Sequence, residues 1–228
     1  MLIEDPLFFG TDPSWPMRVH RQRLLLHRAA LKAYADDLRG RELTVLHQRH
    51  DQAIDTDGHL RLLHAAGYRC FHLADPVDDV LLRRLKGFVQ GSECELSISP
   101  TPMLLTPPHL ADEHFSGGRK PLMARFYEMQ RRRLDLLIDA DGGPLGGRWS
   151  YDADNRKKLP KTIVVPPEPH QVGGRHVDEA RRELVWESLP GIGSWDDFAY
   201  PVNHADASRW LDGFLEQRLQ QFGAYEDA

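Results

Sequence analysis

The sequence predicts an α/β protein with a doubly wound, mostly parallel, Rossmann-like sheet, followed by a linker and a few C-terminal helices. Short apolar segments typical of strands alternate with amphipathic segments typical of helices up to about residue 115. The 228 residues are 41% hydrophobic and 28% charged, as in ordinary globular proteins. This length is sufficient for one domain with a sizeable core, or for one domain and part of a second.

The first elements are a short strand segment and a long helix. Residues 1–3 form the end of an apolar strand, which stops at Glu4-Asp5-Pro6. A helix is predicted from Trp15 to about Leu38, where Arg39-Gly40 ends it. Residues 43–46 then have the apolar pattern of a buried strand.

The next elements continue the alternation. Residues 58–66 are predicted to form a short helix that Gly67 stops, and residues 68–73 form the next strand. A helix over residues 77–89 follows, and residues 93–98 alternate with a period of two, as in a strand. Strand, helix, strand, helix and strand at these lengths indicate parallel β-α-β units.

The second half is predicted to contain a basic helix, a linker and further helices. Apolar residues recur at helical spacing over residues 122–138, arginines lie among them, and a glycine-rich run ends the helix. Prolines and glycines keep residues 157–174 extended. Amphipathic helices are predicted for residues 177–188 and from Asn203 or Asp206 to Gln221, the latter with a large apolar face.

We therefore predict three parts: a sheet domain at 1–115, a basic helix with an interdomain linker at 116–176, and the start of a helical domain at 177–228.

The net charge of −5 and the pI of about 6.2 do not indicate a nucleic-acid-binding protein as a whole, so any such surface is local. Cys70 and Cys94 are too few for a disulfide framework, and we expect both to be buried. Because no signal peptide or membrane-spanning run is found, we expect a cytoplasmic protein without membrane contact.

No catalytic motif or metal site is predicted. The chain has twelve histidines, but none shows a zinc-site spacing with cysteines or a second-shell carboxylate. His59 and His64 are five residues apart, which does not place them on one helical face. The sequence likewise shows no phosphate-binding loop and no serine, histidine and aspartate in the order of a known catalytic triad.

The run from Arg148 to Lys158 mixes aromatic, amide, acidic and basic side chains without periodicity, and this pattern predicts a nucleic-acid-facing loop. Together with the basic helix, the candidate residues are Arg131, Arg132, Trp149, Tyr151, Asn155, Arg156 and Lys157. Two other interpretations stay open. Asp152, Asn155 and Arg156 could bond within the loop and hold two domains together, or the tryptophan and tyrosine could close the edge of the core.

The segment FYEMQRRRLDLLIDADGGPLGGRWSYDADNRKKLP resembles the segment that joins the two large domains of the prokaryotic photolyase-related family, the iron–sulfur bacterial cryptochromes and (6-4) photolyases. Residues 20–29 resemble the family's first long helix, and residues 201–228 resemble the run that leads into its flavin-binding helices. The resemblance covers nearly the whole chain, and GGRWSYDADNR is its most specific part.

The resemblance implies an antenna-type sheet domain that can hold a lumazine-like chromophore, with Glu4 and His27 as candidate ligands. Ordinary roles for these two are a strand-end carboxylate in solvent and a histidine on a helix surface. A family strand with a Gly-Asp-Gln-Leu signature is not found, so the first strand is expected to be missing. The family uses FAD and a four-cysteine iron–sulfur cluster, whose segments follow the position equivalent to Ala228.

Three functional expectations follow. The chain is a truncated or split photolyase-related protein, which is inactive alone and takes part in light-dependent DNA repair or blue-light sensing with a separate flavin domain. Alternatively, it is a stand-alone module that binds nucleic acid, a chromophore or a protein partner. A third alternative is a folded remnant without function. DNA and the flavin domain are thus the expected partners, and enzymatic activity of the chain itself stays open.

Overall fold

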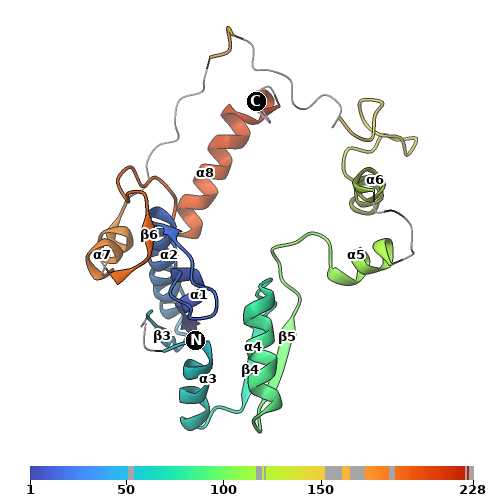
Figure 1. Ribbon diagram of the computed structural model, residues 1–228. Coiled ribbons are helices and arrows are strands. Elements are labelled where there is room, and N and C mark those ends of the chain that lie inside the picture. The colour runs from blue at the N-terminus through green and yellow to red at the C-terminus, as the bar shows by residue number, and fades with distance from the viewer. Residues whose placement is uncertain are drawn as a thin grey trace. The chain divides into compact units, whose positions relative to one another are not determined.

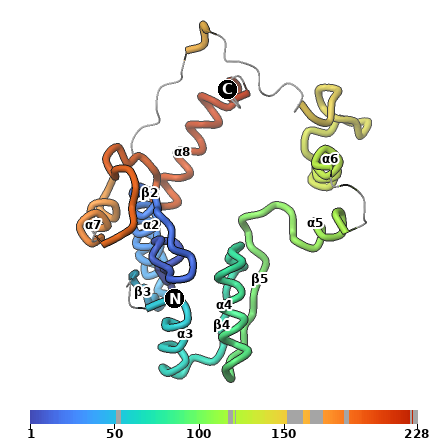
Figure 2. Tube along the Cα trace, in the orientation of Figure 1, coloured from blue at the N-terminus to red at the C-terminus, as the bar shows by residue number. Residues whose placement is uncertain are grey.

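The computed structural model describes residues 1–50, 54–116, 120, 122–151, 161–164, 173–184, 188–223 and 225. Figure 2 follows the chain from one end to the other. The chain forms two compact units. Unit 1 consists of Met1–Phe71, Asp79–Leu96 and Val164–Gln220, and unit 2 of His72–Asp78, Ser97–Ile163 and Gln221–Ala228.

Helices and strands alternate through the first half of the chain, which confirms the predicted α/β class (Figure 1). The helices are α1 (Pro6–Phe9), α2 (Arg21–Gly40), α3 (Thr56–Ala65), α4 (Asp79–Gln90), α5 (Pro108–Phe115), α6 (Met123–Leu134), α7 (Arg175–Glu183), α8 (His204–Gln217) and α9 (Leu219–Phe222). The strands are β1 (Leu2–Ile3), β2 (Val19–His20), β3 (His47–Gln48), β4 (Cys70–Ala74), β5 (Glu95–Ser99) and β6 (Gly191–Ile192).

Within the described residues the strands form three separate pairs, β1 with β3, β2 with β6, and β4 with β5. The first two pairs are parallel. In the third, Glu95 N–H donates to the Arg69 carbonyl and Asp75 N–H to the Ser99 carbonyl, each at 2.8 Å. Both bonds join corresponding ends of the two strands, so this pair is parallel too. The predicted parallel pairing is thus confirmed, whereas a single doubly wound sheet stays a prediction.

The buried strand predicted at residues 43–46 is wrong. Leu43 and Leu46 are 53% and 45% exposed, and only His47 and Gln48 pair with β1. The apolar run resembles a buried strand in sequence, but in the structure it is a connection whose side chains face solvent. Periodicity alone does not distinguish these two cases for so short a segment.

The core of unit 1 is formed mainly by α2 and α7, which pack against each other (Figure 1). The helix predicted from Trp15 begins instead at Arg21, because Val19 and His20 pair with β6. The His20 Nδ1 atom accepts the Gln22 N–H at 3.3 Å and caps the helix. The buried apolar residues of this core are Phe9, Val19, Leu24, Leu25, Ala29, Val177, Ala180, Leu184, Leu189, Phe198 and Val202.

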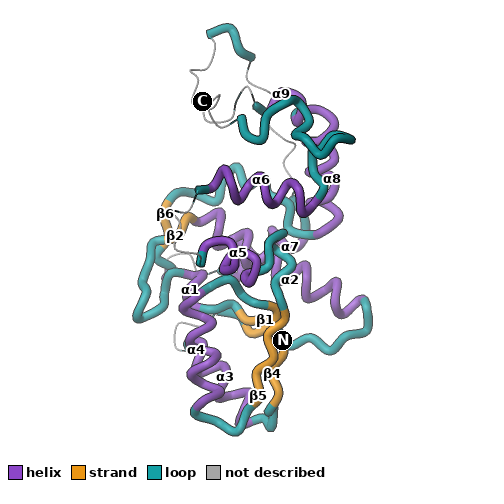
Figure 3. The backbone as a smooth tube through the Cα atoms, turned by 90° about the vertical axis from the view of Figure 1, so that its right-hand side faces the viewer, coloured by secondary structure: helices purple, strands orange, loops and turns teal. Residues whose placement is uncertain are grey.

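Helices α3 and α4 pack side by side (Figure 3). Helix α3 begins where the Asp55 carboxylate accepts the Gly58 N–H at 2.9 Å, and it is followed by Gly67 at φ +93°, as the sequence predicts. Alternate side chains of β4 are turned inward, so Phe71 contacts Phe88 of α4. Cys94 is buried as expected, but Cys70 is exposed because it lies on the outer face of β4.

In unit 2, α6 is shorter than the predicted helix over residues 122–138. Asp135 and Leu137 adopt left-handed conformations at φ 53° and 55°, and these end the helix at Leu134. In unit 1, α8 begins after Asn203, whose side-chain oxygen accepts the Asp206 N–H at 2.9 Å. None of the helices in the described part of the chain combines the length and apolarity needed to cross a membrane.

Candidate functional site

Glu4 follows β1 directly and is completely buried. Its carboxylate forms a salt bridge with Arg28, lies 3.2 Å from His47 Nε2, and accepts the His50 N–H at 2.8 Å. Burial by itself raises the pKa of Glu4, but these three partners together hold it below its usual value. Glu4 is therefore an ionised internal carboxylate and is not open to solvent.

Aromatic rings fill the space beside this carboxylate. Phe9 is fully buried, and its ring stacks on His50 with centroids 4.5 Å apart and planes 7° from parallel. The edge of the same ring meets His27 at 5.5 Å, and Phe8 lies 5.2 Å from His27. Burial lowers the pKa of His27, so its imidazole is neutral at pH 7. His27 is thus partly buried beside these rings and is not a freely exposed histidine on a helix surface.

A cavity of about 610 Å³ lies in unit 1 between α2 and the start of α8. Tyr34 and His204 meet edge to face there, with ring centroids 6.1 Å apart. The Asp37 carboxylate and the Arg41 guanidinium form an ion pair at 2.8 Å on its wall. The lining residues are His27, Ala30, Leu31, Ala33, Tyr34, Asp37, Arg41, Pro201, Val202, Asn203, His204, Ala205 and Ala207.

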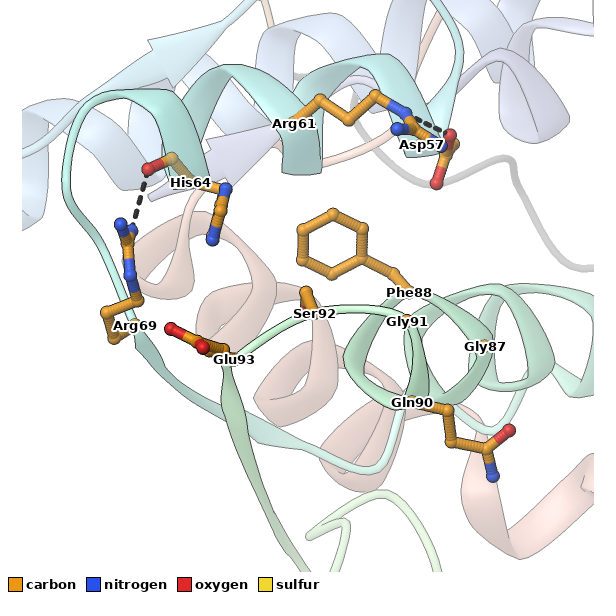
Figure 4. A pocket seen from close by; sticks show the side chains of 10 residues that line it. All are labelled: Asp57, Arg61, His64, Arg69, Gly87, Phe88, Gln90, Gly91, Ser92 and Glu93. Atoms are coloured by element: carbon orange, nitrogen blue, oxygen red, sulfur yellow. Dashed lines mark hydrogen bonds and ion pairs between the residues drawn. The ribbon is translucent and has the colours of Figure 1, made fainter.

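A second, more open cavity of about 850 Å³ lies between one side of α3 and the C-terminal end of α4 (Figure 4). The Phe88 ring projects into it and meets His64 edge to face. Arg61 pairs with Asp57 at 2.7 Å, and Arg69 donates to the His64 carbonyl at 2.7 Å. The lining residues carry two arginines and two carboxylates, so this cavity has no excess charge that selects an anion or a cation. The complete lining is Asp57, Arg61, His64, Arg69, Gly87, Phe88, Gln90, Gly91, Ser92 and Glu93.

In unit 2, the predicted nucleic-acid residue Arg131 is only 4% exposed. Its guanidinium donates to four backbone carbonyls, those of Leu136, Leu137, Arg148 and Trp149, and lies 5.2 Å from the centre of the Trp149 indole. No carboxylate in the described part of the chain pairs with it. Arg131 therefore holds the turn after α6 together, and its donors are not available to phosphate.

Arg132 and Tyr151 also make internal contacts. Arg132 pairs with Glu128 at 3.1 Å, donates to the Gly142 carbonyl at 3.0 Å, and lies 4.1 Å from the centre of the Trp149 ring. The Tyr151 hydroxyl donates to the Gly146 carbonyl at 2.9 Å. The structure thus brings Arg131, Arg132 and Trp149 together. Asp152, Asn155, Arg156 and Lys157 lie outside the described residues.

The iron–sulfur cluster of the resembling family does not fit this chain by itself, because its two cysteines cannot supply four thiolates. Among the described residues no three His, Cys, Asp or Glu side chains gather as metal ligands. The use of FAD, which the resemblance implies for the family, stays a prediction. Tyr34 and His204 could not be identified from the sequence, because no local pattern links them and their contact is made only in the folded chain.

Comparisons with known proteins agree with the resemblance. The family model described as deoxyribodipyrimidine photo-lyase-related protein matches residues 1–200. The chain is 26% identical to a (6-4) photolyase of Agrobacterium fabrum over 215 residues, 92% of this chain and 42% of that protein. It is also 26% identical to the uncharacterized protein R852 of Acanthamoeba polyphaga mimivirus over 176 residues, 72% of this chain and 85% of that protein. The chain belongs to the deoxyribodipyrimidine photo-lyase-related protein family.

Proposed function

We propose that the chain acts as the sheet-containing part of a photolyase-type protein in light-dependent DNA repair or blue-light sensing, together with a helical flavin-binding half. The observation that carries this proposal is the family match over residues 1–200. The chain spans 42% of the length of the (6-4) photolyase, and electron transfer from flavin needs a pocket that positions flavin against the lesion. We therefore assign that chemistry to the partner half.

Helix α8 offers a surface on which such a half could pack. Leu211 and Leu215 are 56% and 46% exposed, and their spacing of four places them along one side of α8. Leu219, 48% exposed, begins α9 directly after it. Apolar stripes of this kind are typical of helices that pack against another helix.

We also propose that the three parallel strand pairs belong to the doubly wound sheet of the family.

A chimera tests the proposal. In it, this chain replaces the matched part of the Agrobacterium fabrum (6-4) photolyase. We expect the chimera to bind FAD and to repair (6-4) lesions only under illumination. A chimera that folds and holds FAD but shows no light-dependent repair would contradict the proposal.

The packing surface is tested by co-expressing this chain with the unmatched part of the photolyase as two polypeptides. We expect them to co-elute, and Leu211→Ser with Leu215→Ser to abolish co-elution. Gln217→Ser, an exposed change on the same helix, is the control and should leave the complex intact. Separate elution of the unmodified pair would argue against α8 as the packing surface.

A second candidate function is a stand-alone binding module. The viral relative favours it, because a match of 176 residues that covers 85% of that protein shows that the relative is itself a short chain. The test is fluorescence anisotropy of labelled single-stranded and duplex DNA with the purified chain alone. Salt-sensitive binding by the chain alone supports the module. The absence of binding, together with an active chimera, leaves the first proposal.

A further inference from the structure

The ligand site that the family resemblance implies, beside Glu4, is closed in this structure. Both carboxylate oxygens of Glu4 contact protein groups, and the ring of His50, whose backbone N–H donates to Glu4, is stacked on Phe9. Since Phe9 and Glu4 are both completely buried, the strand-end space has no room for another ring. A lumazine-type antenna therefore does not fit there.

The cavity between α2 and the start of α8 has the properties that the strand-end space lacks. Its volume of about 610 Å³ lies within the usual size of a small-molecule pocket, roughly 300–1,000 Å³. Small side chains line it, including Ala30, Ala33 and Ala207, and these leave space between the two elements. Tyr34 and His204 supply aromatic surface on which a flat ligand can stack.

The charges of the cavity wall favour a neutral ligand. Arg41 is paired with Asp37, and the pKa of His27 is lowered by burial, so the wall has no net positive charge at pH 7. The Asp37–Arg41 pair offers both an acceptor and donors to the carbonyl and N–H groups at the edge of a heterocycle.

We propose that this cavity, and not the strand-end space beside Glu4, binds a neutral, planar heteroaromatic molecule. The ligand ring stacks on Tyr34 and meets His204 at its edge, since the two rings are nearly perpendicular, and its polar edge contacts Asp37 and Arg41. The proposal goes beyond the proposed function, because it holds whether or not the chain takes part in light-dependent repair.

The test is a titration of the full chain with riboflavin, in which binding is measured by the quenching of riboflavin fluorescence. We expect saturable one-to-one binding, and FMN, which has the same ring and adds a phosphate to the ribityl chain, should bind no more tightly. Ala207→Trp fills the cavity and should weaken binding about tenfold or more. Ser208→Trp places the same side chain on the neighbouring residue of α8, outside the cavity lining, and should change binding less than about twofold. Tyr34→Ala should weaken binding about tenfold through the lost ring contact.

Three results would overturn the proposal. The first is the absence of saturable binding by the unmodified chain. The second is equal binding by the Ala207→Trp and Ser208→Trp variants, which would place the ligand elsewhere. The third concerns Phe9→Ala, which opens the strand-end space, with a thermal melt to confirm that the variant is folded. If only this variant binds riboflavin, the strand-end space and not the α2–α8 cavity is the site.

Discussion

The guanidinium group of Arg131 donates a hydrogen bond to the Trp149 carbonyl at 2.8 Å and also lies 5.2 Å from the centre of the Trp149 indole. Its neighbour Arg132 lies 4.1 Å from the same ring but is half exposed. Two adjacent arginines therefore differ in their tasks. Arg131 organises the turn that follows α6, and Arg132 covers the ring from the solvent side of the helix.

Arg131→Ala should loosen residues 136–149. The change leaves four backbone carbonyls without their donor, which should lower the stability of this region by about 2–4 kcal/mol. Hydrogen–deuterium exchange of peptides covering residues 136–149 measures the effect. Arg132→Ala removes a largely exposed arginine and should cost under about 1 kcal/mol. Equal protection in the two variants would show that Arg131 does not hold the turn.

The basic helix and its glycine-rich end could be predicted from the sequence, but the task of Arg131 could not. The helix has a local periodicity, whereas Arg131 contacts backbone carbonyls 5 to 18 positions away. Every residue carries such a backbone carbonyl, so the sequence does not mark these partners. The end of α6 depends on left-handed conformations at Asp135 and Leu137, and leucine does not signal this conformation. A basic side chain in sequence thus indicates a phosphate contact and a structural anchor equally well.

Arg84 and Arg83 of α4 provide a second matched pair. Arg84 forms two hydrogen bonds, at 2.5 and 2.9 Å, with Asp12, whose carboxylate also accepts the Ser14 and Trp15 N–H groups. Arg83 makes an exposed pair with Asp79 within its own helix. Arg84→Ala removes the ion-pair partner of the buried Asp12 carboxylate and should cost about 3 kcal/mol in urea unfolding, against under about 0.5 kcal/mol for Arg83→Ala. A similar, small cost for both would show that the Asp12 contact does not fasten α4 to the N-terminal loop.

The ion pair of Glu4 should make stability depend on pH. Because the pKa of Glu4 is lower in the folded chain than its ordinary value of 4.5, ionisation stabilises the fold above pH 4.5, and this contribution is lost as the pH falls through the folded pKa. Glu4→Gln should be less stable at pH 7 by about 3 kcal/mol, since the buried Arg28 loses its nearest carboxylate and keeps only the contact with Glu183 at 3.7 Å. It should also lose less stability than the unmodified chain below pH 4.5.

Urea unfolding at pH 7, 5 and 3 measures both effects of the Glu4 change. Glu216→Gln, at an exposed position of α8, serves as the control and should follow the unmodified chain at every pH. Parallel curves for Glu4→Gln and the unmodified chain would show that Glu4 does not carry the pH dependence.

His27 should contribute in a different pH range. Burial keeps its pKa below the ordinary 6.5, so the unfolded chain binds a proton more readily than the folded chain. Stability should therefore begin to fall as the pH drops below 6.5, before Glu4 titrates. His27→Gln should flatten the curve between pH 6.5 and 5, whereas His72→Gln at an exposed position should not. Thermal melting at half-unit pH steps measures this, and an unchanged slope in the His27 variant would contradict it.

Elements with strong local signals were predictable, and those that depend on distant contacts were not. Helix α3 has an aspartate cap and a glycine stop in its own sequence, and it lies where predicted. Strand β2 consists of two residues, and only its pairing with β6, far along the chain, defines it. Similarly, His50 stacks on Phe9 and donates its backbone N–H to the buried Glu4, and neither His50 nor Phe9 carries a sequence pattern that indicates this.

The nucleic-acid surface is predicted for residues 148–158 and no longer includes Arg131, because Arg131 donates only to backbone carbonyls. Arg156→Ala combined with Lys157→Ala should weaken DNA binding and should lower the slope of log affinity against log salt by about 2, since each lost phosphate contact releases roughly one counterion fewer. Arg39→Ala with Arg41→Ala removes the same charge from exposed positions of unit 1 and should leave the slope unchanged. Anisotropy titrations with duplex DNA at several salt concentrations give both slopes. If the two double variants behave alike, the effect comes from net charge, and the loop is then better explained as a segment that bonds within itself.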